Sequence, residues 1–167
     1  MLILGIDPGI ATIGYGMISF DRQKYKYLKA GVIETSKDIP FSKRLDGAYR
    51  GMVSLIQEFD PDTIAIEELF FAKNTKTAMV VSQARGALIL SCVHQDKPLF
   101  EYTPLQVKQG VTGYGRADKS QVTKMVTFLL DLQTPPKPDD AADALAIAIC
   151  HANHIQQING DSRFRPI

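Results

Sequence analysis

Residues 2–9 of the chain read Leu2-Ile3-Leu4-Gly5-Ile6-Asp7-Pro8-Gly9. A short apolar run without polar interruption is typical of a strand that is buried on both faces of a sheet. The Asp-Pro-Gly sequence at its end favours a turn. The run therefore predicts a central strand whose C-terminal end carries the carboxylate of Asp7.

Two apolar segments after this strand favour an antiparallel meander. Residues 13–20 and 25–33 read as strands that are joined by a polar turn. The second segment alternates apolar and polar residues in part, as a strand with one solvent-facing side does. The first three strands of the chain should therefore lie side by side in one sheet.

A helix and a further strand come next. Residues 63–66 form another short apolar run, and Glu67 follows it. Because strand, helix and strand in this order predict a parallel pair, Asp7 and Glu67 should be neighbours at one edge of the sheet. Ligands of open α/β sheets bind at that edge. The helix is predicted from apolar residues at helical spacing, namely Leu45, Ala48, Met52, Leu55, Ile56 and Phe59.

The segment from Asn74 to about Val93 predicts a long helix with apolar residues nearly all the way round. Such a helix is either sandwiched inside the fold or buries a second face against another subunit. In a domain of this size we favour the subunit interface. Shorter elements follow: a strand at 99–102, a helix at 104–111, and a helix after the basic loop 113–119.

The last helix is built of alanine and aliphatic residues but carries acidic groups near its start. Asp140 and Asp143 are three residues apart, so their side chains should lie on one helix face and could share a cation. Pro138 suits the first turn, and we interpret Asp139 as a cap that answers the helix dipole. Asp143 lies deeper among small residues, where an unpaired charge is costly. It should therefore have a basic partner or a metal ion.

Length and composition favour a single α/β domain. With 167 residues, 45% of them apolar, the chain can form one real core. We assign residues 1–156 to this domain and expect 157–167 to be a disordered tail. The lack of an apolar run of ~18 residues or of a basic leader predicts a cytoplasmic protein without membrane contact. Cys92 and Cys150 fall in apolar helical patterns and should be reduced core residues.

The charge is unevenly distributed along the chain. The net charge is only +1, but residues 73–137 carry nine basic side chains against four acidic ones. A surface that faces phosphate would give this imbalance, and so would an ordinary solvated face.

Four carboxylates carry the chemistry of the predicted site: Asp7, Glu67, Asp140 and Asp143. Ligation by oxygen alone suits Mg²⁺ or Mn²⁺ rather than zinc. Two such ions ~3.5–4 Å apart can promote hydrolysis of a phosphodiester. His151 lies ~12 Å further along the helix than Asp143, too far to join the site, so we interpret His151 and His154 as last-turn residues that suit the helix dipole.

Six motifs in the same order resemble the RuvC Holliday junction resolvases, over roughly residues 1 to 154. They are Leu4-Gly5-Ile6-Asp7-Pro8-Gly9, Ile66-Glu67 with Phe70-Phe71-Ala72-Lys73-Asn74, Gln83-Ala84-Arg85-Gly86, Val107-Lys108-Gln109, Ala117-Asp118-Lys119-Ser120-Gln121-Val122 and Asp140-Ala141-Ala142-Asp143-Ala144-Leu145-Ala146. The resemblance implies a ribonuclease H-like mixed sheet of about five strands with helices on both faces. It also implies a homodimer that nicks two opposing strands of a four-way DNA junction, with two Mg²⁺ ions per site, for which Mn²⁺ can substitute. A branch-migration motor of the RuvA and RuvB type is the expected partner complex.

The resemblance also implies roles for individual residues. The four carboxylates would be the catalytic metal ligands, although Glu68 and Asp139, beside two of them, leave the choice of ligand slightly open. The expected DNA contacts are Phe70, Lys73, Arg85, Lys108, Arg116 and Lys119.

Several of these contacts have a structural alternative. Phe70 could be core while Phe71 faces the junction, Arg85 could pair with an internal acid, and Lys119 could be an exposed first-turn residue. Arg163 and Arg165 in the tail lie outside the resemblance.

Two rival functions remain open at this point. One is a catalytically idle junction-binding protein of the same fold, which Mg²⁺-dependent nicking would exclude. The other is an ATPase of the actin and sugar-kinase type, whose first strand also ends in Asp followed by Gly. Those enzymes close two lobes over the nucleotide, and 167 residues are too few for both.

Overall fold

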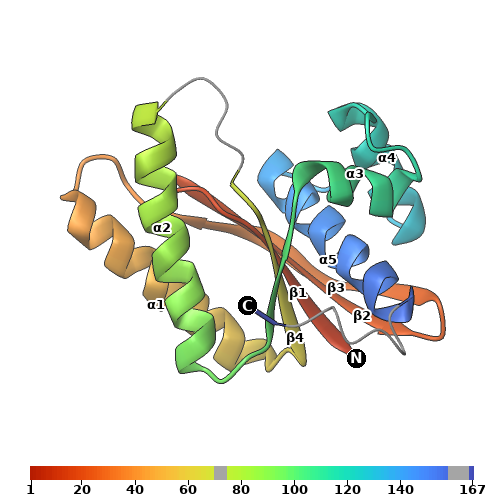
Figure 1. The fold of residues 1–167 in the computed structure, drawn as a ribbon, viewed down its shortest axis with the longest axis horizontal. Helices are drawn as coiled ribbons and strands as arrows, with labels where there is room; N and C mark the ends of the chain where they lie inside the picture. Colours follow the sequence, from red (N-terminus) through yellow and green to blue (C-terminus); the bar gives the residue numbers. More distant parts are fainter. Residues whose placement is uncertain (70–74, 158–165) are drawn as a thin grey trace.

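The computed structural model of the protein describes residues 1–69, 75–157 and 166–167. Within these residues five strands form one mixed sheet in the order β3-β2-β1-β4-β5 (Figure 1). The strands are β1 (Leu2–Asp7), β2 (Thr12–Asp21), β3 (Lys24–Glu34), β4 (Thr63–Glu67) and β5 (Leu99–Tyr102). The helices are α1 (Phe41–Phe59), α2 (Thr75–His94), α3 (Pro104–Thr112), α4 (Lys119–Leu129) and α5 (Asp139–Gln157).

The strand directions agree with those predicted from the sequence. β1 is antiparallel to β2, and β2 is antiparallel to β3, which is the expected meander. β1 and β4 are parallel, with Ile6 opposite Ile66, and β5 extends the parallel part beyond β4. Asp7 and Glu67 follow this pair directly, so they end neighbouring strands at one edge of the sheet, as predicted.

Helices cover both faces of the sheet (Figure 1). α1 and α2 lie over one face, while α5 lies over the other with α3 and α4 packed against it. Successive residues of β1 point to opposite faces: Leu4 belongs to the apolar cluster with Met52 of α1 and Leu88 of α2, and Ile3 to the cluster with Leu145 of α5. The continuous apolar run of β1 is thus explained by burial on both faces.

α5 lies very close to β1 and β2 because both sides lack bulk where they meet. A Cβ atom on Gly5 would come within 2.0 Å of the Ala144 carbonyl oxygen, and one on Gly14 within 2.1 Å of the Asp140 carbonyl oxygen. Glycines on the strands and alanines on the helix therefore let the backbones approach each other. This contact brings the start of α5, with its carboxylates, to the end of β1.

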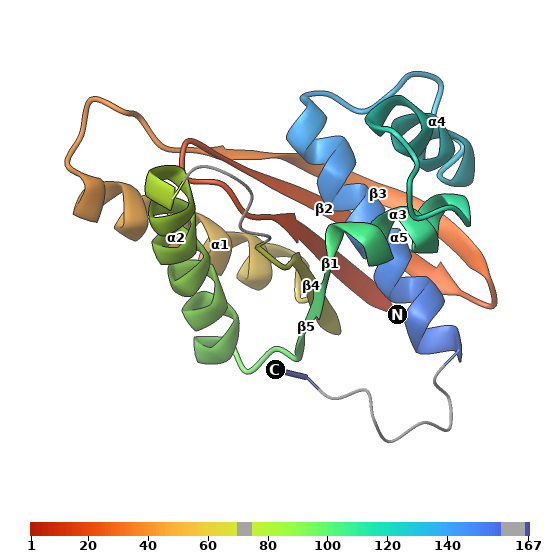
Figure 2. The same ribbon diagram turned by 45° about the horizontal axis from the view of Figure 1, so that its top comes forward.

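The structure also bears on the cysteines, the helices and the end of the chain. Cys92 and Cys150 are both buried and unpaired, as predicted. No helix in the described parts of the chain is long and apolar enough to cross a membrane. Most of the expected tail, 157–167, lies outside the described residues. At its end, the N–H of Ile167 donates a hydrogen bond of 2.9 Å to the carbonyl of Leu99, beside the start of β5 (Figure 2).

The interpretation of His151 as a residue that serves the helix end is wrong. Its side chain is fully buried, with Nε2 3.0 Å from the Thr63 hydroxyl and Nδ1 2.6 Å from the Tyr102 hydroxyl. The reason is that α5 faces the sheet along its whole length, and position 151 continues the stripe of Ala144 and Ala148 at helical spacing. A buried imidazole there is neutral and joins α5 to β4 and β5.

This imidazole predicts a loss of stability in mild acid. Burial, with a smaller contribution from His154, lowers the pKa of His151 from 6.5 to about 3. Between these values the unfolded chain binds a proton that the folded chain does not, so stability is present above pH 6.5 and falls as the pH drops, by up to ~1.4 kcal/mol per pH unit. Urea unfolding at pH 7.5 and 5.0 should show a smaller loss for His151→Asn than for the wild type.

Asp7 and Glu67, whose pKa values burial raises to about 7, also titrate between these two pH values, but they are the same in both proteins. The difference in pH slope between wild type and His151→Asn therefore reports on the histidine alone. Equal slopes would contradict a neutral, buried His151.

Candidate active site

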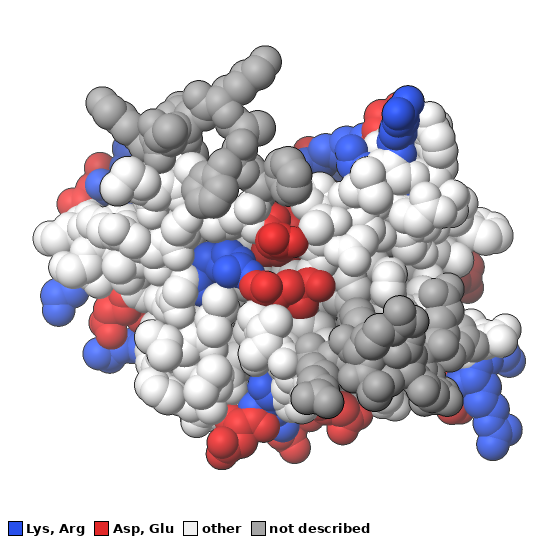
Figure 3. All heavy atoms as spheres, in the orientation of Figure 1, with Lys and Arg blue, Asp and Glu red and all other residues white. Residues whose placement is uncertain are grey.

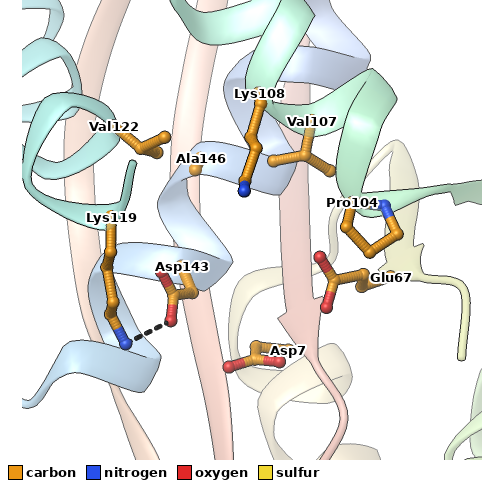
Figure 4. Close-up of a pocket in the computed structure, with 9 residues that line it drawn as sticks. All are labelled: Asp7, Glu67, Pro104, Val107, Lys108, Lys119, Val122, Asp143 and Ala146. Carbon is orange, nitrogen blue, oxygen red and sulfur yellow. Dashed lines mark ion pairs between the residues drawn. The ribbon is translucent and has the colours of Figure 1, made fainter. Parts of the chain in front are cut away.

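A cavity of about 250 Å³ lies at the edge of the sheet where β1 and β4 end (Figure 4). Three carboxylates point into it from different elements: Asp7 from β1, Glu67 from β4 and Asp143 from α5. Lys108 of α3 points into the cavity from the top of this view, and Lys119 at the start of α4 lies beside Asp143. On the surface, acidic and basic atoms lie next to each other near the middle of the face drawn in Figure 3. The apolar part of the wall is formed by Pro104, Val107, Val122 and Ala146.

The crowding of these acids changes their protonation. Burial, followed by the charges of Glu67, Asp143 and Asp140, raises the pKa of Asp7 from 3.8 to about 7, and Lys119 opposes this. Burial and the charge of Asp143 raise the pKa of Glu67 from 4.5 to about 7, while Lys108 opposes it. The two lysines therefore do not neutralise the negative charge of the carboxylates. The remaining negative charge favours binding of a further cation.

Asp140 lies beside the cavity rather than in its wall. Its charge acts on Asp7, and its backbone lies against Gly14 of β2, the residue paired with Asp7. The structure thus brings Asp7, Glu67 and Asp143 into one cavity, with Asp140 next to Asp7. This agrees with the expected grouping, although Asp140 does not line the cavity.

The residues fit a divalent cation by their chemistry. All four candidate ligands offer carboxylate oxygens, which suit Mg²⁺ and Mn²⁺. Among the described residues, no three side chains of His, Cys, Asp or Glu are already drawn together around one point. The carboxylates surround the cavity and would have to converge to coordinate an ion.

Asp143 has a basic partner, which is one of the two alternatives expected from the sequence. The ammonium of Lys119 lies 3.0 Å from Asp143 Oδ2 and 3.3 Å from Asp139 Oδ2. Lys119 is also the first residue of α4, after Asp118, whose carboxylate accepts the Gln121 N–H at 2.9 Å. The first-turn position of Lys119 and its place beside the acids therefore go together.

The start of α5 differs in one detail from the expectation. The helix begins at Asp139, and Pro138 precedes it instead of filling the first turn. The carbonyl of Pro138 accepts the N–H of Ala141 at 3.0 Å. Asp139 lies in the first turn and is largely exposed, where it shares Lys119 with Asp143.

The other expected DNA contacts differ in their exposure, and some of them lie outside the described residues. Arg116 is exposed in the loop between α3 and α4. Phe70, Lys73 and the alternative Phe71 lie outside the described residues. Arg85 is mostly buried and forms an ion pair with Glu101 of β5, which favours the internal pairing that the sequence left open. Glu101 had no assigned role, because no pattern in the sequence links it to Arg85.

The sequence of the chain matches one family of known proteins. The family model described as RuvC, crossover junction endodeoxyribonuclease, matches residues 3–151. The chain belongs to the RuvC family. It is 55% identical over 153 residues to the crossover junction endodeoxyribonuclease RuvC of Clostridioides difficile, covering 92% of this chain and 90% of the relative. The RuvC of Alkaliphilus oremlandii is 56% identical over 153 residues, covering 92% of this chain and 93% of that relative.

Solved RuvC structures have the same fold. The Thermus thermophilus RuvC structure superposes with a TM-score of 0.90 at 33% identity, over 100% of both chains. The complex of T. thermophilus RuvC with a Holliday junction substrate gives a TM-score of 0.88 at 31% identity, also over 100% of both chains. The ribonuclease H-like fold with a five-stranded mixed sheet, implied by the resemblance, is therefore confirmed.

Proposed function

We propose that this RuvC chain resolves four-way DNA junctions by metal-dependent nicking of two opposing strands, during recombination and repair. The observation that carries the proposal is the cavity in which Asp7, Glu67 and Asp143 meet two lysines, at the sheet edge where α/β folds bind ligands. Relatives at 55–56% identity are named crossover junction endodeoxyribonucleases, which supports the same substrate.

The proposed reaction is hydrolysis of a phosphodiester, for which each group has a role. Asp7, Glu67 and Asp143, with Asp140 beside them, would hold Mg²⁺. Two bound ions would supply Lewis acidity and lower the pKa of an attacking water. Mn²⁺ prefers the same oxygen ligands and can replace Mg²⁺.

The lysines and the apolar wall complete the site. Lys119 and Lys108 lie where they can offset negative charge that develops on the scissile phosphate. Lys119 would then leave Asp143 to the metal and turn its ammonium toward the phosphate. Val107 and Val122 form part of the apolar wall beside these groups.

An immobile four-way junction and a linear duplex, each with and without Mg²⁺, test this function. We expect two symmetric nicks in the junction, only with Mg²⁺, and none in the duplex. Tight junction binding without nicking would support the idle binding protein instead. Cleavage of both substrates alike would refute structure-specific action.

We further propose that the chain acts as a homodimer through α2. The outward side of α2 exposes three large apolar residues, Met79 at 64%, Leu90 at 53% and Val93 at 54%. These follow helical spacing and form an apolar stripe of the kind that marks an interface. A two-fold dimer would present two identical sites to a nearly symmetric junction.

Replacing Leu90 by glutamate is expected to convert the dimer to monomers. A charge in the middle of an apolar interface loses its hydration without gaining a partner. Sedimentation velocity at micromolar concentration should show the monomer mass for this variant and twice that mass for the wild type. Leu105→Glu is the matched control, because Leu105 is 62% exposed on α3 and away from the stripe. A monomeric wild type would refute the interface.

The remaining parts of the proposal concern DNA and partners. Lys108, Lys119 and Arg116 are proposed to contact the junction backbone, with Phe70 and Lys73 before α2. We also propose work in the cytoplasm together with a branch-migration motor of the RuvA and RuvB type. A pull-down of purified motor subunits on the junction complex tests that partnership.

A further inference from the structure

Arg85 joins the helix α2 to the strand end that carries Glu67. Its Nε donates a hydrogen bond of 3.4 Å to the backbone carbonyl of Glu67. The same guanidinium forms an ion pair with Glu101 on β5, the strand next to β4. The side chain of Arg85 is 16% exposed and that of Glu101 27%, so the pair is largely inside the protein.

The position of Glu67 explains why this link matters. Glu67 is the last residue of β4, where the chain leaves the sheet. Beyond it, β5 holds the chain through the N–H of Glu68, which donates to the Tyr102 carbonyl at 2.8 Å. The bond from Arg85 to the Glu67 carbonyl comes from a different element, α2. It restrains the peptide that sets the direction of the Glu67 side chain.

The planar guanidinium is suited to this task. Its five N–H donors lie in a fixed fork, so one nitrogen can bond the carbonyl while another faces a carboxylate. A lysine could keep the charge but would not reach both partners with fixed geometry. Glu101 in turn holds the guanidinium, since it approaches from β5.

We propose that Arg85, anchored by Glu101, is a positioning residue that aims the Glu67 carboxylate into the metal cavity. The inference rests on the proposed metal-dependent nuclease and adds to it a residue that touches neither metal nor DNA. It differs from a phosphate contact, for which Arg85 would have to be free of Glu101 and accessible. Arg85 is instead held by protein groups on two strands.

Binding of Mn²⁺ to the DNA-free protein, measured by isothermal titration calorimetry, tests the proposal. We expect Arg85→Lys and Glu101→Gln each to weaken Mn²⁺ binding by about 10-fold, as partners of ligands commonly do. The double variant should be no weaker than the stronger single one, because both changes break the same link. Junction affinity, measured without divalent metal, should stay at the wild-type value for all three.

The control is Arg50→Lys, since Arg50 pairs with Asp46 on the exposed side of α1. It should change neither Mn²⁺ nor junction affinity. Calorimetry separates misplacement from unfolding: partial unfolding lowers the number of occupied sites, whereas a misplaced Glu67 weakens the affinity of a full set.

The possible failures are distinct. Wild-type Mn²⁺ affinity in Arg85→Lys and Glu101→Gln would overturn the inference while leaving the nuclease intact. Weaker junction binding in Arg85→Lys with unchanged Mn²⁺ affinity would also overturn it, in favour of a phosphate contact. A wild-type protein that nicks no junction would instead refute the proposed function.

Discussion

Replacing Asp7 by asparagine is expected to reduce junction nicking by more than ~100-fold. This loss is larger than that caused by mutating a residue that only hydrogen-bonds to a metal ligand, which is about 10–100-fold. Asp7 ends the central strand β1 and is the acid on which Glu67, Asp143 and Asp140 all act. Asparagine keeps the shape of the side chain but removes the negative charge that would bind a cation. Nicking of a labelled junction under single-turnover conditions measures the loss.

The same substitution should leave junction binding nearly unchanged. Binding to the DNA backbone depends mainly on basic side chains, and none of these is altered. Asp21→Asn, at the far end of the neighbouring strand β2, is a matched control with normal nicking expected. Near-normal nicking by Asp7→Asn would show that Asp7 is not a catalytic metal ligand. It would also contradict the assignment of the carboxylate cluster as the active site.

Replacing Gly5 by alanine is expected to destabilise the protein by at least ~3 kcal/mol, the upper end of the usual cost of overpacking. The added methyl group would lie 2.0 Å from the Ala144 carbonyl oxygen and 2.7 Å from the Ala148 nitrogen. Both are backbone atoms of α5, so no side chain can rotate to make room. The helix itself must move away from β1. Urea unfolding monitored by circular dichroism measures the loss.

Gly47→Ala provides the matched control for this change. Gly47 lies within α1, and a Cβ atom there would meet nothing closer than Thr35 Cγ2 at 3.9 Å. Alanine should stabilise this helix by about 0.5–1 kcal/mol. A Gly5→Ala variant as stable as the wild type would show that α5 does not need its close contact with β1. The presence of Asp143 and Asp7 in one cavity would then need an explanation other than this close contact.

Strand ends were the part of the site that could be predicted best. The apolar runs before Asp7 and Glu67 have the length of buried strands, and the helix between them predicts a parallel pair. Two carboxylates at the ends of parallel neighbours must lie close together. The alanines around Asp143 allow the close approach of the last helix, which the contacts of Gly5 and Gly14 show.

Features that depend on which side of a helix faces inward were harder to predict. His151 carries a polar side chain near a helix end, but its spacing from Ala144 and Ala148 places it in the core. Its partners Thr63 and Tyr102 are far away in sequence, and no local sequence pattern predicts these contacts. The same is true of Arg85 and Glu101, whose contact depends on how α2 lies across β4 and β5.

Anomalous diffraction from crystals grown with Mn²⁺ is the most direct test of the central claim, a metal site built on Asp7 and Glu67. We predict Mn²⁺ peaks in the cavity, with carboxylate oxygens of Asp7, Glu67 and Asp143 or Asp140 as ligands. The Asp7→Asn protein, crystallised in the same way, should lose these peaks. Crystals of a protein that nicks junctions with Mn²⁺, but holds no Mn²⁺ at Asp7 or Glu67, would contradict the account.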